Sequence, residues 1–238
     1  MALSNQRKEL GADQIFAILA LVSLFITALV TAQLTASKVL AFGLPVSLPI
    51  TESTLILPGA VLAYALTFLA SDCVTELYGR KTATIMVNIG FVMNFVLLLL
   101  VWSTILAPAA EASVDPAMFE EVLGASTNIV IASLAAYIVS QNFDVYFFDY
   151  LRERTDGTYL WFRNIVSTAA SQAIDTVIFV TLGFFIVPQL LGFGEVLPGD
   201  VVIQLIVGQY LFKLALVGLD TPFVYAIVHL VRSRTDLG

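Results

Sequence analysis

Six long apolar segments recur along the chain and constrain its fold more than any other feature. Each has about 20 mostly apolar residues, the length that a helix needs to cross the hydrocarbon layer of a membrane. A soluble domain has no need of six such segments. The sequence therefore predicts an all-α integral membrane protein, a bundle of six transmembrane helices that forms one domain over residues 1–238. The expected spans are 15–37, 55–71, 84–106, 125–148, 162–187 and 201–230.

The composition agrees with a membrane protein and argues against several other classes. Only 12% of the residues are charged and 59% are hydrophobic, whereas a soluble domain has about 25% charged residues. The single cysteine, Cys73, and the single histidine, His229, cannot form a disulfide framework or a typical zinc site. There is no phosphate-binding loop, no hydrolase motif and no basic stripe for nucleic acid. We therefore expect no enzymatic activity, no cofactor and no direct contact with nucleic acid.

The basic residues predict the orientation of the bundle. Nine of the 11 Lys and Arg residues lie before span one, after span six, or in and beside the loops that follow spans two and four. Cytoplasmic loops carry an excess of Lys and Arg, so we expect both termini in the cytoplasm of a multi-pass protein in the cell membrane. These nine residues are Arg7, Lys8, Arg80, Lys81, Arg152, Arg154, Arg163, Arg232 and Arg234.

Polar residues recur inside spans five and six. In span five, Asn164, Gln172 and Asp175 share one helical face with small hydroxyl residues. Asp175 lies roughly 20 Å from the cytoplasmic end at 1.5 Å per residue, near the middle of the bilayer. Gln209 and Lys213 share a face of span six. An acid and a base at matching depth predict an ion pair or a shared ligand site, because ionisable groups in a bilayer are costly and usually functional. A salt bridge that only fixes packing is the alternative.

Spans two and four carry further polar residues. In span four, Gln141 and Asp144 continue a stripe that begins at Tyr137, with Asn142 alongside. Amides, an acid and aromatic rings on one face suit a planar ligand that forms hydrogen bonds, although hydrogen bonds between helices would use the same residues. Glu76 lies at the cytoplasmic end of span two, where either a ligand or solvent is a suitable neighbour.

Two sequence runs carry a resemblance to a known family. The first is SDCVTELYGRKTA at 71–83, and the second is NFDVYFFDYLRERTDGTYLWFRNIVSTAASQAIDT at 142–176. Together they resemble the signature motifs of the queuosine precursor transporter family, which is grouped with the vitamin uptake transporters. The likeness covers spans two to six; span one and the acidic outer loops carry little of the pattern.

The resemblance implies a carrier that imports 7-cyano-7-deazaguanine or 7-aminomethyl-7-deazaguanine, precursors of queuosine and archaeosine. Its partners would be this small molecule and the lipid bilayer, and homo-oligomerisation is left open. Transport would follow alternating access, with proton coupling through Asp175 as a hypothesis. Asp175 or Glu76 would accept hydrogen bonds from the ligand, Gln141 and Gln172 would frame it, and Lys213 would balance charge. The expected substrate-binding residues are Glu76, Gln141, Asn142, Asp144, Asn164, Gln172, Asp175, Gln209 and Lys213.

Other classes stay open at this stage. A substrate-binding S-component of an energy-coupling-factor importer would need separate ATPase and scaffold chains. The small residues Ala28, Ala32 and Ala36, spaced by four in span one, would then contact the scaffold, although such a stripe also suits packing within the chain. A channel-like or structural protein would bind no ligand saturably, and an intramembrane hydrolase would use paired acids such as Asp144 and Asp175.

Overall fold

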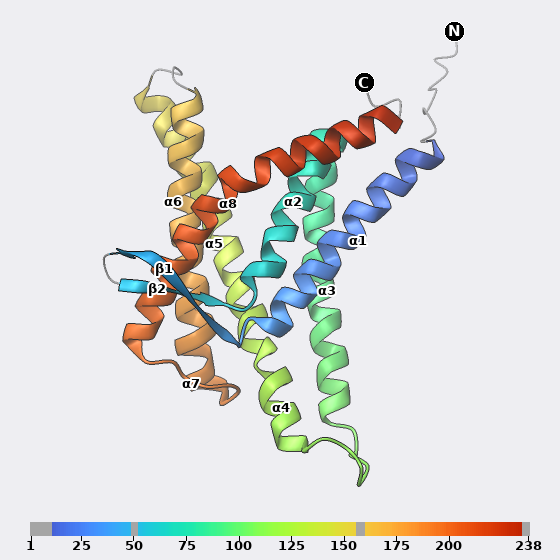
Figure 1. The fold of residues 1–238 in the computed structure, drawn as a ribbon, viewed down its shortest axis with the longest axis vertical. Coiled ribbons are helices and arrows are strands. Elements are labelled where there is room, and N and C mark those ends of the chain that lie inside the picture. Colours follow the sequence, from blue (N-terminus) through green and yellow to red (C-terminus); the bar gives the residue numbers. More distant parts are fainter. Residues whose placement is uncertain (1–10, 49–51, 156–159, 235–238) are drawn as a thin grey trace.

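The protein is a bundle of membrane-spanning helices (Figure 1). The computed structural model describes residues 11–48, 52–155 and 160–234. Within these ranges six helical segments are long and apolar enough to cross a membrane, which confirms the predicted fold class. The segments are α1 (Ala12–Thr35), α2 (Val61–Tyr78), α3 (Arg80–Ile105), α4 (Pro116–Gly124) with α5 (Ser126–Arg154), α6 (Leu160–Thr181) with the π-helical turn η1 (Leu182–Ile186) and α7 (Val187–Leu191), and α8 (Gly199–Arg234).

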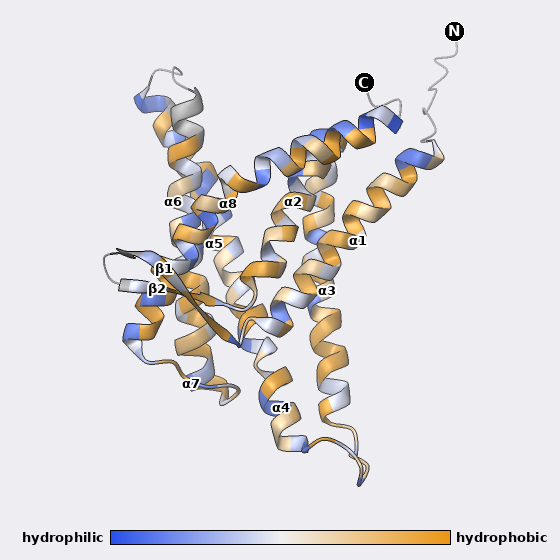
Figure 2. Cartoon of the chain, viewed as in Figure 1, coloured by the Kyte–Doolittle hydropathy of each residue, from blue (hydrophilic) through white to orange (hydrophobic). Residues whose placement is uncertain are grey.

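The bundle has two ends. We call the end at which α1 begins and α8 finishes the termini end, and the opposite end, at which α5 and α8 begin, the hairpin end (Figure 1). Hydrophobic residues make up most of the helices between these ends (Figure 2). Phe16, Leu99 and Leu190 are among the large apolar side chains that are mostly exposed. Helices satisfy their own backbone hydrogen bonds, so such a surface suits contact with lipid.

A β-hairpin connects α1 to α2, where the sequence analysis expected a loop and the start of a span. Strands β1 (Val39–Leu48) and β2 (Glu52–Pro58) pair antiparallel. The expected span 55–71 is therefore wrong at its start, because 55–58 is strand and α2 begins at Val61. Gly59 makes the turn into α2 at a point where an added Cβ would collide with the carbonyl oxygen of Thr35. A glycine is needed for this close approach of backbone to backbone.

Helix α8 contacts both halves of the bundle. Its first half packs against α6 and β2, and its second half packs against α2. Gly208 lies directly against the backbone of Ile56 in β2, where a Cβ would overlap the carbonyl group. Pro222 lies inside α8 and cannot donate the hydrogen bond that the carbonyl of Gly218 would otherwise accept. The helix changes direction along its length (Figure 1), as expected for an internal proline.

Two separate hydrophobic clusters hold the helices together. The hairpin-end cluster joins α1, the start of α2, α5, α6, η1 and α8, and consists of Ala32, Ala36, Ala60, Ile129, Ala132, Ala136, Phe179, Val180, Phe184, Val202 and Leu205. The termini-end cluster joins α1, α2, α3 and α8, and consists of Leu21, Phe25, Leu29, Ala70, Cys73, Val74, Ala83, Met86 and Val228. No described residue of α5 or α6 belongs to the second cluster.

Candidate functional site

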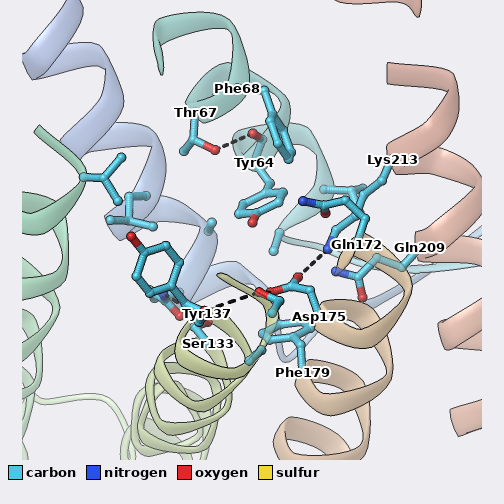
Figure 3. A pocket seen from close by; sticks show the side chains of 18 of the residues that line it. Tyr64, Thr67, Phe68, Ser133, Tyr137, Gln172, Asp175, Phe179, Gln209 and Lys213 are labelled. Carbon is cyan, nitrogen blue, oxygen red and sulfur yellow. Dashed lines mark hydrogen bonds and ion pairs between the residues drawn. The ribbon is translucent and has the colours of Figure 1, made fainter. Parts of the chain in front are cut away.

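A cavity of about 270 Å³ lies in the middle of the bundle, between α1, α2, α3, α5, α6 and α8. Sites for drug-sized ligands occupy roughly 300–1,000 Å³, so this cavity suits a small, compact molecule. Helices α6 and α8 run side by side and direct polar side chains into the cavity (Figure 3).

An ion pair forms one wall of the cavity. The Lys213 ammonium lies 2.6 Å from the Asp175 carboxylate, and the Ser140 hydroxyl donates to the other carboxylate oxygen at 3.3 Å. Lys213 is 4% exposed and Asp175 is 15% exposed. This geometry confirms the predicted meeting of acid and base from spans five and six. A carboxylate accepts several hydrogen bonds, so Asp175 retains capacity for a ligand donor.

Aromatic rings form other parts of the lining. Tyr64 and Phe68 of α2 meet edge to face with centroids 5.0 Å apart. Phe91 of α3 and Tyr137 of α5 lie 4.3 Å apart. The Lys213 ammonium is 5.7 Å from the centre of the Tyr64 ring, within the range of a cation–π contact. Tyr64 and Tyr137 both face the cavity (Figure 3). Flat rings on these walls offer stacking surfaces to a planar ligand.

Three glutamines carry unused acceptors in the lining. The side-chain carbonyl oxygens of Gln33 (α1), Gln172 (α6) and Gln209 (α8) are buried and have no hydrogen-bond partner among the residues that the structure describes. Buried polar groups are nearly always hydrogen-bonded. The three oxygens therefore suit a guest that brings N–H or O–H donors.

The residues that line the cavity are buried to different extents towards its two ends. Towards the hairpin end its lining includes Ala32, Ala60 and Ile129, all buried in the hairpin-end cluster. Towards the termini end the lining includes Gln141 of α5, which is exposed, and Ser71 of α2, which is half-buried. The lining is therefore more exposed towards the termini end than towards the hairpin end.

Comparison with known proteins identifies the family. A family model described as "Putative vitamin uptake transporter" matches residues 58–227, most of the chain. The chain belongs to the vitamin uptake transporter family. It is also 31% identical over 171 residues to the "Probable queuosine precursor transporter" of Bacillus subtilis (strain 168), a match that covers 71% of each chain. No solved structure gave a significant match.

These findings confirm the resemblance found in the sequence and show which elements of the fold it covers. The family match begins at the end of β2 and takes in α2 to most of α8. Helix α1 and β1 lie outside the match, yet α1 lines the cavity of this vitamin uptake transporter through Phe25, Leu29, Ala32 and Gln33.

The structure brings five of the nine expected site residues together. They line one cavity, from three helices, although the sequence analysis assigned them from separate stripes. Their role in binding a substrate stays a prediction. The five residues are Gln141 of α5, Gln172 and Asp175 of α6, and Gln209 and Lys213 of α8.

The other four expected residues are not among those that line the cavity. Glu76 is 56% exposed and pairs with Arg232 at 2.9 Å. Asn142 is exposed, and its amide donates to the Ile138 carbonyl of its own helix at 2.6 Å. Asp144 is half-buried and has one carboxylate oxygen without a partner. The side chain of Asn164 lies outside the described part of the chain. Substrate contacts by these four residues also stay predictions.

Several lining residues were not assigned to the site from sequence. Tyr64, Phe68 and Tyr137 belong to the same helical stripes as Glu76 and Gln141, so periodicity could have found them. Ser140 lies one position before Gln141 and bonds to Asp175, a contact that depends on how α5 and α6 pack. Gln33 gave no signal, because a lone glutamine in an apolar span forms no stripe.

The small-residue stripe of α1 packs against other helices of the same chain. Ala28, Ala32 and Ala36 are all buried, between 0% and 4% exposed. Small side chains allow close approach of helices, and here that approach is to the protein's own bundle. The stripe is therefore not a free surface for a scaffold chain, as the S-component alternative would require.

Proposed function

We propose that this vitamin uptake transporter imports 7-deazaguanine bases, either 7-cyano-7-deazaguanine or 7-aminomethyl-7-deazaguanine, for queuosine or archaeosine synthesis. The observation that carries the proposal is the central cavity, in which aromatic walls from α2, α3 and α5 face polar side chains from α6 and α8. The name of the Bacillus subtilis relative supports the choice of substrate.

The chemistry of the cavity matches that of the base. A 7-deazaguanine presents a donor edge, made of a ring N–H and an exocyclic amine, which suits the Asp175 carboxylate and the free oxygens of Gln172 and Gln209. The ring carbonyl of the base suits the Lys213 ammonium. Its flat faces suit Tyr64 and Tyr137. The cavity volume of about 270 Å³ favours a free base over a bulkier conjugate.

Transport would proceed by alternating access around this site. The chain would lie in the cell membrane with both termini in the cytoplasm, so that the more exposed side of the cavity would face the cytoplasm. Release into the cytoplasm would follow from this state. Exposure to the outside would require the hairpin-end cluster to separate while the termini end closes.

Ligand binding is the first test. The detergent-purified chain should be stabilised by 7-cyano-7-deazaguanine or its aminomethyl form and not by common vitamins. Binding to the folded state alone adds about 2.7 kcal/mol of stability at a hundredfold excess over Kd. Thermal unfolding with each compound measures the effect. A shift with a vitamin, and none with any deazaguanine, would leave a carrier but exclude the proposed substrate.

Uptake by the chain alone is the second test. Liposomes that contain only this protein should accumulate radiolabelled 7-cyano-7-deazaguanine into a trap, without ATP or another subunit. An S-component would bind the base but would not transport it without its ATPase and scaffold. Uptake that responds to an imposed pH gradient in the wild type, and not in Asp175→Asn, would support proton coupling through Asp175.

A further inference from the structure

We infer that Gln33 of α1 is a specificity-determining residue, which accepts a hydrogen bond from one N–H donor of the substrate. The inference rests on the proposed function, because it concerns the same cavity. It adds a contact from a helix that lies outside the family match at 58–227. This chain would therefore recognise its substrate partly through a segment that the family match does not cover.

Gln33 is placed and oriented for such a contact. It is 3% exposed and is the polar member of the four α1 residues in the cavity lining, with Phe25, Leu29 and Ala32. Its amide nitrogen donates to the Ser133 hydroxyl of α5 at 3.5 Å. That bond directs the amide nitrogen towards α5 and leaves the carbonyl oxygen without a partner among the described residues.

A purely structural role explains these contacts less well. Thr31 and Thr35 of the same helix bond to backbone carbonyls of α1 at 2.8 Å, which is how polar residues in a span usually satisfy themselves. Gln33 makes one long bond across helices and leaves a buried acceptor unused. An unpaired buried acceptor is costly, so an apolar residue would serve packing better.

The position of Gln33 distinguishes its acceptor from the others. Gln172 and Gln209 contribute oxygens from α6 and α8, and Gln33 contributes one from α1. A guest that satisfies all three oxygens needs donors on more than one edge. A free 7-deazaguanine has them, because its exocyclic amine and its pyrrole N–H point in different directions. The carbonyl oxygen of Gln33 would accept a hydrogen bond from one of these two donors.

The test compares the wild type with Gln33→Met, in which the acceptor is removed and the side-chain length is kept. The ligands are 7-cyano-7-deazaguanine, its analogue without the exocyclic amine, and its N9-methyl derivative. The analogue that lacks the donor bonded to Gln33 should bind the wild type roughly 10- to 100-fold more weakly than the parent base. Gln33→Met should bind the parent base more weakly by a similar factor and should lose the discrimination against that one analogue. Gln189→Met, on the exposed surface of α7, is the matched control and should behave as the wild type.

The outcomes separate the two proposals. If the wild type binds none of the deazaguanines, the proposed function fails and the inference falls with it. If the wild type binds the base and Gln33→Met keeps its affinity or the full discrimination, only the inference is overturned. Should Gln33→Met fold poorly, Ser133→Ala removes the bond that orients Gln33 while keeping its acceptor. It should reduce the same discrimination by a smaller factor, and unchanged discrimination in this variant would also count against the inference.

Discussion

The two ends of the bundle are held together differently. At the hairpin end, one cluster of buried residues joins α1, α5, α6 and α8, and many of its members are alanines that let the helices approach closely. At the termini end, the buried cluster joins α1, α2, α3 and α8 and includes no described residue of α5 or α6. Helices α5 and α6 are therefore packed into the bundle at the hairpin end and stand apart from its core at the termini end.

This difference suggests which part of the transporter moves. Packed clusters favour discrete arrangements over gradual deformation, so the proposed alternating access would separate the helices at one end while they close at the other. Helices α5 and α6 carry Gln141, Gln172 and Asp175, three residues of the cavity lining. We propose that these two helices tilt as a unit against the remaining helices. The cavity would then lie between the moving and the static helices.

The largest effect is expected at Asp175, which links α6 to α8. Asp175→Asn leaves the 4% exposed Lys213 without its ionic partner. Removal of one member of a buried pair costs about 3–5 kcal/mol, so the variant should lose that much stability and most of its uptake, and only the residual uptake can be tested for a response to a pH gradient. Thermal unfolding without ligand and liposome uptake measure the two effects.

The double variant Asp175→Asn with Lys213→Met separates packing from function. It should regain most of the lost stability, because no buried charge is left unpaired, and it should remain inactive. Recovery of uptake along with stability would show that the pair only fixes packing and would remove it from the proposed site.

A second substitution tests closure at the hairpin end. Gly208→Val places atoms where the Ile56 backbone now lies, so β2 must move away from α8. Overpacking costs about 1–3 kcal/mol, and we expect most uptake to be lost because the hairpin end can no longer close. Gly218→Ala, on the same helix but with open space around an added Cβ, is the control. If Gly208→Val transports like Gly218→Ala, close packing of the hairpin on α8 is not needed for transport.

Cysteine labelling compares the two ends directly. In a background that carries Cys73→Ala, we expect Gln141→Cys at the more exposed side of the cavity to react readily with a soluble maleimide. Ala132→Cys, in the hairpin-end cluster, should stay unreactive because Ala132 is fully buried. Saturating 7-cyano-7-deazaguanine should slow the labelling of Gln141→Cys. Equal labelling of both positions would contradict the described asymmetry.

The smallest effect is expected at the surface of the termini end. Glu76 and Arg232 link α2 to α8, but their side chains are 56% and 47% exposed, and exposed ion pairs contribute about 0.2–1 kcal/mol. Glu76→Gln should therefore change stability by no more than this and leave the Kd for the base unchanged. A large loss of affinity would instead support the sequence-based assignment of Glu76 to the site and require α2 to move inward when the base binds.

The sequence predicted most of the bundle and the polar pair at its centre. Length and hydropathy are enough to predict spans, and the depth of Asp175 and Lys213 in neighbouring spans was enough to predict their meeting. The hairpin was missed because residues 55–58 of β2 are apolar and merged with the next span, and because Gly43 and Pro45 of β1 indicated a loop. Pro58 and Gly59 marked the true boundary, because this pair disfavours a continuous helix.

The candidate site was harder to predict than the spans. Periodicity shows which residues share a face, but it does not show which faces meet or at what depth they meet. Glu76 and Gln141 both belong to polar stripes, yet one lies on an exposed surface and the other lines the cavity. Gln33 depends entirely on the packing of α1 against α5, which no local pattern encodes.

Pro222 would lower the energy needed to bend α8 during the proposed transport cycle. Because α8 is shared by both ends, the proposed tilt of α6 against α2 would bend this helix. An ordinary helix would have to stretch or break a hydrogen bond at the bend, whereas Pro222 has already removed the bond to the carbonyl of Gly218. The bend can therefore widen or narrow without breaking that bond. Pro222→Ala would restore the hydrogen bond to the carbonyl of Gly218 and should make α8 harder to bend. The variant should therefore destabilise whichever state requires the sharper bend.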